Sequence, residues 1–324
     1  MVAFAKIAVL GAGRVGSLIA LELSKHHEVT AVDLSGGALE VLRPAVSTVT
    51  ADLSSEERIA EVVRSFELVV NALPGNLGFR VLKTCLRVEK DLVDVSFMPE
   101  DPLQLGDLAA SAGVTAVVDA GFAPGLSNIL VGRIQSELGP LDEVEVNVGG
   151  LPREPRPPLY HSVLFSLVDL VDEYLRPARV IRGGRVVPVD PLSAIERVRV
   201  LGFDLERFPT DGLRTMLQTI RAENMTEYTL RWPGHLERMK ILKELGLLDR
   251  QYLEIALGIL KKHMAYEVAD ISIMEVIGRV GGRAMKYVLY DEATGRHSSM
   301  ARVTGYTAIQ VVELLIRGLV PEGL

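Results

Sequence analysis

The stretch that decides the fold of the first third of the chain is residues 6–16, Lys-Ile-Ala-Val-Leu-Gly-Ala-Gly-Arg-Val-Gly. Its apolar half predicts a strand, and the Gly-x-Gly-x-x-Gly half predicts a tight turn into a helix that continues to Leu23. In such a turn Gly11 permits the bend, Gly13 lets the backbone approach a pyrophosphate, and Gly16 lets the helix pack against the strand. The free N–H groups at the start of the helix attract phosphate. The stretch therefore predicts a dinucleotide-binding site.

A carboxylate follows the second predicted strand, because Val29–Val32 ends in Asp33. A carboxylate at this position accepts hydrogen bonds from the ribose hydroxyls, and it would repel the 2′-phosphate of NADP, so the sequence predicts NAD. The alternative is a glycine turn in a Rossmann domain that has lost its cofactor, which the acid at the strand end disfavours. The residues expected around the cofactor lie in the turn or at strand ends: Gly11, Gly13, Arg14, Val15, Gly16, Asp33, Asp52, Asn71, Leu73, Pro74 and Ser96.

Composition narrows the class of protein. The 324 residues are 48% hydrophobic and 24% charged, as in a soluble globular protein with one large or two modest domains. The net charge of −7, without a basic run, disfavours nucleic acid and anionic membranes as partners. We expect no spanning segment, no signal peptide and no metal site. The single cysteine, Cys85, excludes an internal disulfide framework and favours a cytoplasmic location.

Strand and helix patterns alternate over the first 125 residues, which predicts an α/β fold with a doubly wound parallel sheet. Helical patterns such as Ser55–Arg64 and Gly78–Leu86 lie between the strand patterns. Ligands bind at the carboxyl edge of such a sheet. The predicted strands are Ile7–Leu10, Val29–Val32, Thr48–Thr50, Leu68–Asn71, Leu92–Val95 and Thr115–Asp119.

From Leu141 onward the pattern changes and predicts a second, α+β domain with a mostly antiparallel or mixed sheet. The Gly- and Pro-rich segment Gly149–Pro158 is expected to be a loop, and Ser162–Leu175 is expected to be an amphipathic helix. A closing helix is expected over Ser299–Gly318. The predicted strands of this part are Val144–Val148, two in Ala178–Pro188, Tyr228–Arg231, Ile271–Val280 and Arg283–Tyr290.

Three segments, in order, resemble motifs of the saccharopine dehydrogenase-like family. They are Asp119-Ala-Gly-Phe-Ala-Pro-Gly-Leu-Ser-Asn128, Thr229-Leu-Arg-Trp-Pro-Gly-His235 and Ser299-Met-Ala-Arg-Val-Thr-Gly305. Within that family, Asp172–Pro177 and Thr210–Arg214 are most similar to the lysine 6-dehydrogenase branch. One departure is Ala123, since saccharopine-forming relatives carry Asp at this position.

The resemblance implies a discontinuous Rossmann domain over 1–125 and 299–324, with a substrate and dimerisation domain over 126–298. It also implies a homodimer acting on a small amino-acid substrate. The implied reaction is the NAD-dependent oxidative deamination of the ε-amine of L-lysine to 2-aminoadipate 6-semialdehyde, which cyclises. Two alternatives stay open: reductive condensation of an amine with a carbonyl, as in saccharopine or carboxynorspermidine dehydrogenases, and a non-catalytic NAD-binding protein.

Amine oxidation needs a proton acceptor, because the free ε-ammonium has a pKa near 10.4. It also needs a cation for the substrate carboxylate and an acid for its ammonium. His235, at the start of a predicted helix, is the first acid–base candidate, with a helix-terminal structural histidine as the alternative. Arg231 could hold a carboxylate, or it could form a surface ion pair. Asp119 could bind the substrate amine, or it could fix the conformation of its own loop. Asp211 could line the site, or it could cap a helix. The expected catalytic residues are His235, Asp119, Arg231, Asp211 and His161.

Overall fold

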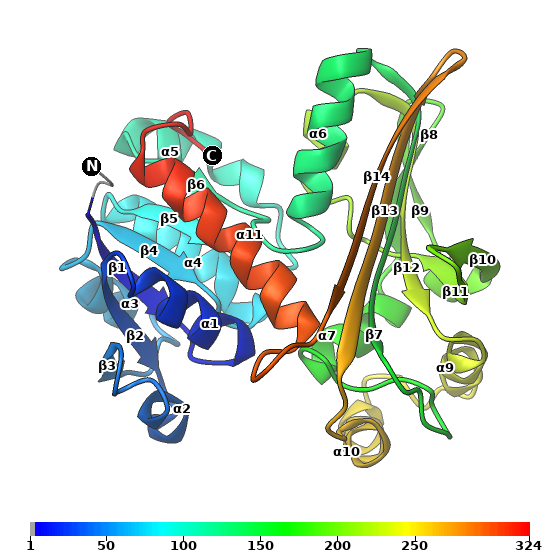
Figure 1. The fold of residues 1–324 in the computed structure, drawn as a ribbon, viewed down its shortest axis with the longest axis horizontal. Helices are drawn as coiled ribbons and strands as arrows, with labels where there is room; N and C mark the ends of the chain where they lie inside the picture. Colours follow the sequence, from blue (N-terminus) through cyan, green and yellow to red (C-terminus); the bar gives the residue numbers. More distant parts are fainter. Residues whose placement is uncertain (1–3) are drawn as a thin grey trace. The chain divides into compact units, whose positions relative to one another are not determined.

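The computed structural model describes residues 4–324, which form two compact units (Figure 1). The first unit comprises the chain up to Leu126 together with Ala301–Leu324, and the second comprises Ser127–Met300. The boundaries expected from the sequence differ from these by one or two residues. The second unit is thus an insertion between the sixth strand of the first unit and its last helix.

The first unit contains a six-stranded parallel sheet in the order β3-β2-β1-β4-β5-β6. This order, with β1 in the middle, is that of a doubly wound nucleotide-binding sheet, so the predicted fold class is confirmed. The predicted strand Thr115–Asp119 is too long, because the strand ends at Val117 and Asp119 has a φ of +51°. The strands are β1 (Lys6–Leu10), β2 (Glu28–Asp33), β3 (Ser47–Thr50), β4 (Leu68–Asn71), β5 (Asp91–Asp94) and β6 (Ala116–Val117).

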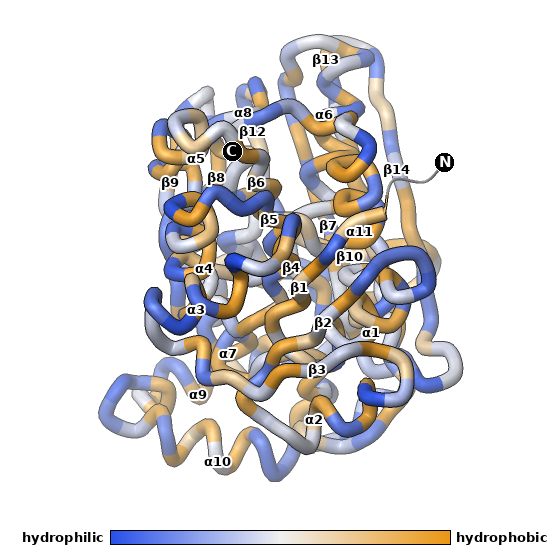
Figure 2. Tube along the Cα trace, turned by 90° about the vertical axis from the view of Figure 1, so that its left-hand side faces the viewer, coloured by the Kyte–Doolittle hydropathy of each residue, from blue (hydrophilic) through white to orange (hydrophobic). Residues whose placement is uncertain are grey.

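Helices cover both faces of this sheet, which explains why the successive residues 7–10 of β1 are all apolar and buried (Figures 1 and 2). Ile7 faces a core that includes Leu18 and Ala308, whereas Ala8 faces a second core on the other side. Gly305 lets two helices approach closely, since a Cβ there would lie 2.5 Å from a methyl carbon of Leu18. The helices are α1 (Arg14–Leu23), α2 (Gly36–Glu40), α3 (Glu56–Val63), α4 (Gly75–Arg87), η1 (Pro102–Leu105), α5 (Gly106–Ala112) and α11 (Ser299–Ile316).

The second unit is built on an eight-stranded mixed sheet with the order β10-β11-β12-β7-β13-β14, and β8 joins it beside β12 and pairs with β9. Strands β7 and β12 are parallel, and the other pairs are antiparallel. The strands are β7 (Leu141–Pro152), β8 (Ala178–Arg182), β9 (Arg185–Val189), β10 (Glu196–Val200), β11 (Phe203–Pro209), β12 (Ala222–Arg231), β13 (Asp270–Val280) and β14 (Arg283–Glu292). The helices are α6 (Leu126–Leu138), α7 (Leu167–Leu175), η2 (Pro191–Ser193), α8 (Met216–Thr219), α9 (His235–Glu244) and α10 (Leu253–Met264).

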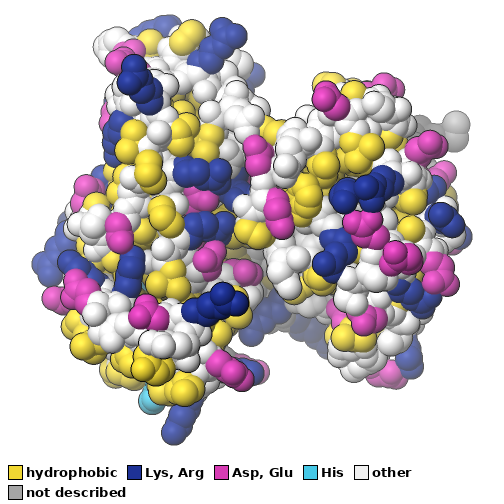
Figure 3. Space-filling view, turned by 180° about the vertical axis from the view of Figure 1, so that it is seen from behind, with side chains coloured by type: hydrophobic (Ala, Val, Ile, Leu, Met, Phe, Trp, Pro, Cys, Tyr) yellow, Lys and Arg dark blue, Asp and Glu magenta, His cyan; other side chains and the backbone are white. Residues whose placement is uncertain are grey.

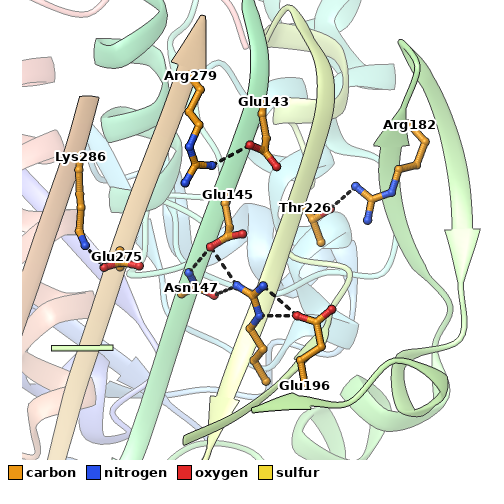
Figure 4. Close-up of polar contacts among 10 residues, drawn as sticks. Glu143, Glu145, Asn147, Arg182, Glu196, Thr226, Glu275, Arg279 and Lys286 are labelled. Carbon is orange, nitrogen blue, oxygen red and sulfur yellow. Dashed lines mark hydrogen bonds and ion pairs between the residues drawn. The ribbon is translucent and has the colours of Figure 1, made fainter. Parts of the chain in front are cut away.

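The two faces of this sheet differ in chemistry. One face packs against helices: a Cβ on Gly278 of β13 would lie 2.5 Å from Ile134 of α6, and Phe208 of β11 stacks on Tyr174 of α7 with ring centroids 5.4 Å apart. We call this the helix-side face. The opposite face carries ion pairs between neighbouring strands, such as Arg279 with Glu143 at 2.7 Å (Figure 4).

Two expectations for this unit are wrong in part. Gly149–Pro152 belongs to β7 rather than to a loop, because its glycines serve close approach: a Cβ on Gly149 would lie 2.8 Å from that of Leu230. The helix expected from Ser162 begins only at Leu167, where the Ser166 hydroxyl caps it. The Ser162 hydroxyl instead donates to the Met264 carbonyl, and residues 162–166 before the helix are not helical.

Surface chemistry is mixed. Charged side chains of both signs are spread over the face in Figure 3, and hydrophobic ones also reach the surface near α9 and α10, where Ile241 and Ile255 are exposed. Among the described residues, no helix combines the length and the apolar character that crossing a membrane requires.

Candidate functional site

The glycine turn of the first unit has the geometry that its sequence predicts. Gly11 has a φ of +98°, and a Cβ there would lie 2.7 Å from the carbonyl oxygen of Ala72. A Cβ on Gly16 would lie 2.0 Å from the Gly11 carbonyl oxygen, so the helix can start this close to the strand only with glycine. Around Gly13, in contrast, a Cβ would meet nothing within 4 Å. The backbone at Gly13, where α1 begins, is therefore open to a ligand, which fits a bound pyrophosphate.

Asp33 ends β2 beside this turn, and its carboxylate accepts two backbone hydrogen bonds. The donors are the N–H groups of Ala12 and Ser35, each 2.7 Å from a carboxylate oxygen. The half-buried carboxylate thereby links the glycine turn to the loop after β2. A carboxylate held in this place suits the hydroxyls of an adenosine ribose.

A buried polar group occupies the ends of β4 and β5. The Asn71 amide donates to one oxygen of Asp94 at 2.8 Å, and the Ser96 N–H and hydroxyl both donate to the other at 2.6 Å. Burial, with a smaller contribution from the charge of Asp119, raises the pKa of Asp94 to about 7, although these hydrogen bonds act to lower it. The carboxyl edge of the sheet thus holds a carboxyl group that titrates near neutral pH, and the Asp119 charge lies close to it.

The sequence reasoning missed Asp94, although it named Asn71 and Ser96. The available signal was an acid within the apolar strand pattern Leu92–Val95, since a buried acid in a parallel strand needs hydrogen-bond donors from the neighbouring strand ends.

The remaining predicted cofactor residues lie at the same edge of the sheet, in turns. The Leu73 N–H donates to the Asn71 side chain at 3.3 Å, and Pro74 precedes the first residue of α4. Asp52 is exposed and accepts a hydrogen bond from the Ser54 N–H at 2.9 Å. Arg14 and Val15 form the first turn of α1.

In the second unit, a chain of hydrogen bonds joins α7, α9 and β12. The Arg231 Nε–H donates to the Tyr174 hydroxyl at 3.3 Å, and that hydroxyl lies 2.8 Å from Nε2 of His235. The other ring nitrogen of His235, Nδ1, lies 2.6 Å from the Leu159 carbonyl oxygen. Since a carbonyl oxygen only accepts, Nδ1 carries the proton and Nε2 accepts from Tyr174.

This chain is fully buried, and burial sets its charges. Burial, reinforced by the charge of Arg231, lowers the pKa of His235 to about 3, and burial raises the pKa of Tyr174 to about 12. Both groups are therefore neutral at physiological pH. With both nitrogens of His235 engaged, the geometry favours a positioning role for this residue: it holds the segment that carries Leu159.

Arg231 forms a buried ion pair rather than a surface one, because its Nη2 lies 2.6 Å from Glu173 Oε2 and its side chain is 2% exposed. Glu173 is not among the residues that the sequence predicts for the site. Burial raises the pKa of Glu173, and the charge of Arg231 opposes that rise.

His161 lies two residues after Leu159, and its ring centroid is 5.0 Å from that of His235. The residue is 1% exposed, and neither of its ring nitrogens has a hydrogen-bond partner within residues 4–324. Burial lowers the pKa of His161 well below its usual value, with a further contribution from the Arg231 charge. Leaving a buried polar atom unpaired costs about 1–3 kcal/mol, so a neutral imidazole in this state points to a bound water or ligand.

Asp211 belongs to a second group of charges. Its carboxylate accepts from Arg179 through Nε at 2.7 Å and Nη2 at 2.9 Å, and also from the Arg179 backbone N–H at 3.1 Å. Asp211 does not cap α8, which begins at Met216. Arg176 and Arg214 lie 3.9 and 4.0 Å from the same carboxylate. Arg176 also lowers the pKa of Glu173, so the two charged groups are neighbours.

The structure thus brings together three of the five predicted catalytic residues, His161, Arg231 and His235, and adds Glu173 and Tyr174 to them. Asp211 lies in the neighbouring group, and Asp119 lies in the first unit. No cluster of three or more potential His, Cys, Asp or Glu metal ligands occurs in the described part of the chain.

Taken together, the doubly wound sheet, the open glycine turn and the polar carboxyl edge define a nucleotide-binding protein of the dehydrogenase fold. Sequence comparison identifies its family. Residues 7–117 match the family model for the saccharopine dehydrogenase NADP binding domain, and residues 121–323 match that for the saccharopine dehydrogenase C-terminal domain. The chain belongs to the saccharopine dehydrogenase family.

Individual relatives are distant. The chain is 25% identical over 265 residues to the mitochondrial alpha-aminoadipic semialdehyde synthase of Mus musculus, covering 76% of this chain and 29% of that protein. It is 26% identical over 222 residues to alpha-aminoadipic semialdehyde synthase of Arabidopsis thaliana, covering 64% of this chain and 21% of that protein. The chain therefore spans less than a third of these relatives.

A third relative is the NADP(+), L-glutamate-forming saccharopine dehydrogenase of Saccharomyces cerevisiae, 21% identical over 266 residues, which cover 77% of this chain and 60% of that protein. The solved apo structure of an L-Glu-forming saccharopine dehydrogenase from the same organism superposes with a TM-score of 0.80 at 19% identity. The superposition covers 99% of this chain and 93% of the yeast chain, so both units share the fold of the yeast structure.

Proposed function

We propose that the protein is a dinucleotide-dependent oxidoreductase that removes a hydride from the amine-bearing carbon of an amino acid. The proposed reaction is the oxidative deamination of the ε-amine of L-lysine to 2-aminoadipate 6-semialdehyde, with release of ammonia. Family membership supports the class of reaction. The finer assignment to lysine rests on the similarity of Asp172–Pro177 and Thr210–Arg214 to the lysine 6-dehydrogenase branch.

The observation that carries the amine chemistry is the unpartnered imidazole of His161. Hydride removal requires a neutral amine, so the site must hold the amine nitrogen once it has lost its extra proton. His161 is buried and neutral, and its ring nitrogens are not occupied by other groups of the described chain. We assign it the role of hydrogen-bond acceptor for the substrate nitrogen, and we assign His235 and Tyr174 the positioning of the segment that carries it.

Two arginines near Asp211 support an amino-acid substrate. Arg176 and Arg214 lie 3.9 and 4.0 Å from its carboxylate, and Arg176 also pairs with Asp172 at 2.8 Å. Either guanidinium could hold the substrate carboxylate, since guanidinium groups bind carboxylates well.

We propose NAD as the cofactor, although the matched family model and the yeast relative are both described by NADP. The support is Asp33, whose negative charge is held beside the glycine turn by two backbone N–H groups. Bound NAD would supply the hydride acceptor. Residues of the turn from Gly11 to Gly16 would hold its pyrophosphate, and Asp33 would hold its adenosine ribose.

The test is a substrate screen with purified protein at alkaline pH. Each amino acid and diamine is offered with NAD or NADP, and formation of reduced nicotinamide is followed by absorbance. We expect lysine with NAD to give the highest kcat/KM. If reduced nicotinamide is instead consumed only when lysine is combined with an aldehyde or keto acid, the reductive-condensation alternative replaces this proposal. Cofactor binding without turnover in any arm would indicate a non-catalytic NAD-binding protein.

A further inference from the structure

Glu206 of β11 is a buried carboxylate that the proposed function has not used. Its register partner on β12 is Arg231, and Phe208, two residues along the same strand, stacks on Tyr174, so Glu206 lies on the helix-side face next to Arg231. The residue is 7% exposed, and its Oε2 is buried without a hydrogen-bond partner within residues 4–324. An unpaired carboxylate oxygen in such a place is costly, which calls for a donor from outside the described chain.

Arg231 makes its own hydrogen bonds elsewhere. Its guanidinium donates to Glu173 at 2.6 Å, to the Tyr174 hydroxyl at 3.3 Å and to the Leu230 carbonyl at 2.9 Å. Arg197, the register partner of Glu206 on β10, is exposed, and Oε2 of Glu206 has no hydrogen-bond partner within residues 4–324. The buried carboxylate oxygen therefore lies beside a guanidinium that is engaged elsewhere.

His161 lies near Arg231, because its ring centroid is 5.0 Å from that of His235, which the Tyr174 hydroxyl joins to Arg231. Two unpartnered acceptors, one anionic and one neutral, thus lie near one engaged guanidinium. A ligand that matches them must bring several N–H or O–H donors and one positive charge. A primary ammonium group has three donors and a single charge in a compact form.

We propose that Glu206 and His161 form the binding site for the side-chain ammonium group of the substrate. This inference rests on the proposed function, which it deepens by naming the residue that selects the amine. The amine binds as a cation, which is its dominant form at neutral pH. Glu206 holds the charge, and one N–H of the ammonium donates to an unprotonated ring nitrogen of His161. At alkaline pH the bound nitrogen loses its extra proton to water, and the neutral amine stays in place.

The inference predicts a defined pattern of ligand affinities, measured by titration calorimetry with three probes. n-Butylamine carries only the terminal amine, L-norleucine carries the α-amino and carboxylate groups without it, and L-lysine carries both. The variant is Glu206→Gln, which keeps the shape of the side chain and removes its charge. The matched control is Asp204→Asn on the same strand, where the side chain is 81% exposed.

We expect Glu206→Gln to lower the affinity for n-butylamine and for lysine by roughly 10- to 100-fold, because a hydrogen bond to a charged group contributes about 1.5–3 kcal/mol. Norleucine affinity should stay within about twofold. Asp204→Asn should bind all three probes like the wild type. Fluorescence of Trp232, the only tryptophan of the chain, checks that the variant is folded. If Glu206→Gln does not fold, the same comparison is made with Glu206→Asp, in which a shortened carboxylate should weaken n-butylamine but not norleucine.

The outcomes separate this site from the reaction. Unchanged n-butylamine affinity in folded Glu206→Gln overturns the site, even if lysine is oxidised. Loss of norleucine affinity would assign Glu206 to the α-ammonium group and would also overturn the proposed site. A wild-type protein that binds no n-butylamine overturns it as well, since the two acceptors would then hold water. Selective loss of n-butylamine binding in a protein that never oxidises lysine supports the site and removes the proposed reaction.

Discussion

Replacing Tyr174 with phenylalanine removes one hydroxyl from the centre of the buried hydrogen-bond chain. That hydroxyl donates to His235 at 2.8 Å and accepts from Arg231 at 3.3 Å, and all three side chains are at most 2% exposed. Each buried group left unpaired costs about 1–3 kcal/mol. A water molecule in the vacated space could replace one of the two lost hydrogen bonds. We therefore expect the free energy of unfolding of the second unit to fall by about 2–4 kcal/mol.

Urea unfolding followed by tryptophan fluorescence measures this loss directly. Trp232 is the only tryptophan, and its indole N–H donates to the Pro152 carbonyl at 2.8 Å within the second unit, so its emission reports on that unit. The control is Tyr252→Phe, whose side chain lies at the surface and should change stability by less than about 0.5 kcal/mol. A Tyr174→Phe variant that unfolds at the same urea concentration and slope as the wild type would refute the role given to the chain.

Four further predictions concern charged or titratable groups. Between pH 6.5 and about 3 the second unit should lose stability as pH falls, because His235 binds a proton in the unfolded chain but not in the folded one. In His235→Asn, the free energy of unfolding measured by Trp232 emission should depend less on pH. Asp94 acts in the opposite direction in the first unit. Its folded pKa of about 7 exceeds the usual 3.8, so this carboxyl adds stability as pH falls from about 7 to 3.8. Asp94→Asn should remove this pH dependence, which hydrogen exchange of the β5 amides measures. Asp33→Ala with Ser35→Arg should shift cofactor preference from NAD toward NADP by at least about tenfold in kcat/KM, and a wild type that uses both cofactors equally would contradict the account of Asp33. His161→Asn should lower kcat by at least about tenfold while NAD affinity changes little, because the substrate nitrogen loses its hydrogen-bond acceptor, and an unchanged kcat would exclude His161 from the amine site.

The first unit could be predicted closely because its sequence signals are local. The glycine turn, the apolar strands and the polar strand ends each depend on a few adjacent residues. Each of the six strands overlaps its predicted range, although β6 is shorter than predicted. The second unit was harder, since its glycines serve contacts between segments distant in sequence. Gly149 reads as a loop residue, yet it lies within β7 because Leu230 of another strand packs against it.

The candidate site shows the same division. Sequence position alone suggested His161, Arg231 and His235, which the fold brings together. Tyr174 was not among the predicted site residues, because the hydrogen bonds of its hydroxyl depend on β12 and α9, which lie far along the chain. Glu206 gave no signal at all, because its burial beside Arg231 follows only from the pairing of β11 with β12.

The most direct test of the central claim is the stoichiometry of product formation when the purified protein is mixed with L-lysine and NAD at alkaline pH. The account predicts one reduced nicotinamide and one ammonia for each lysine consumed, with the rate lost in His161→Asn and kept in the exposed-histidine control His263→Asn. Formation of reduced nicotinamide without ammonia, or at the wild-type rate in His161→Asn, would contradict it.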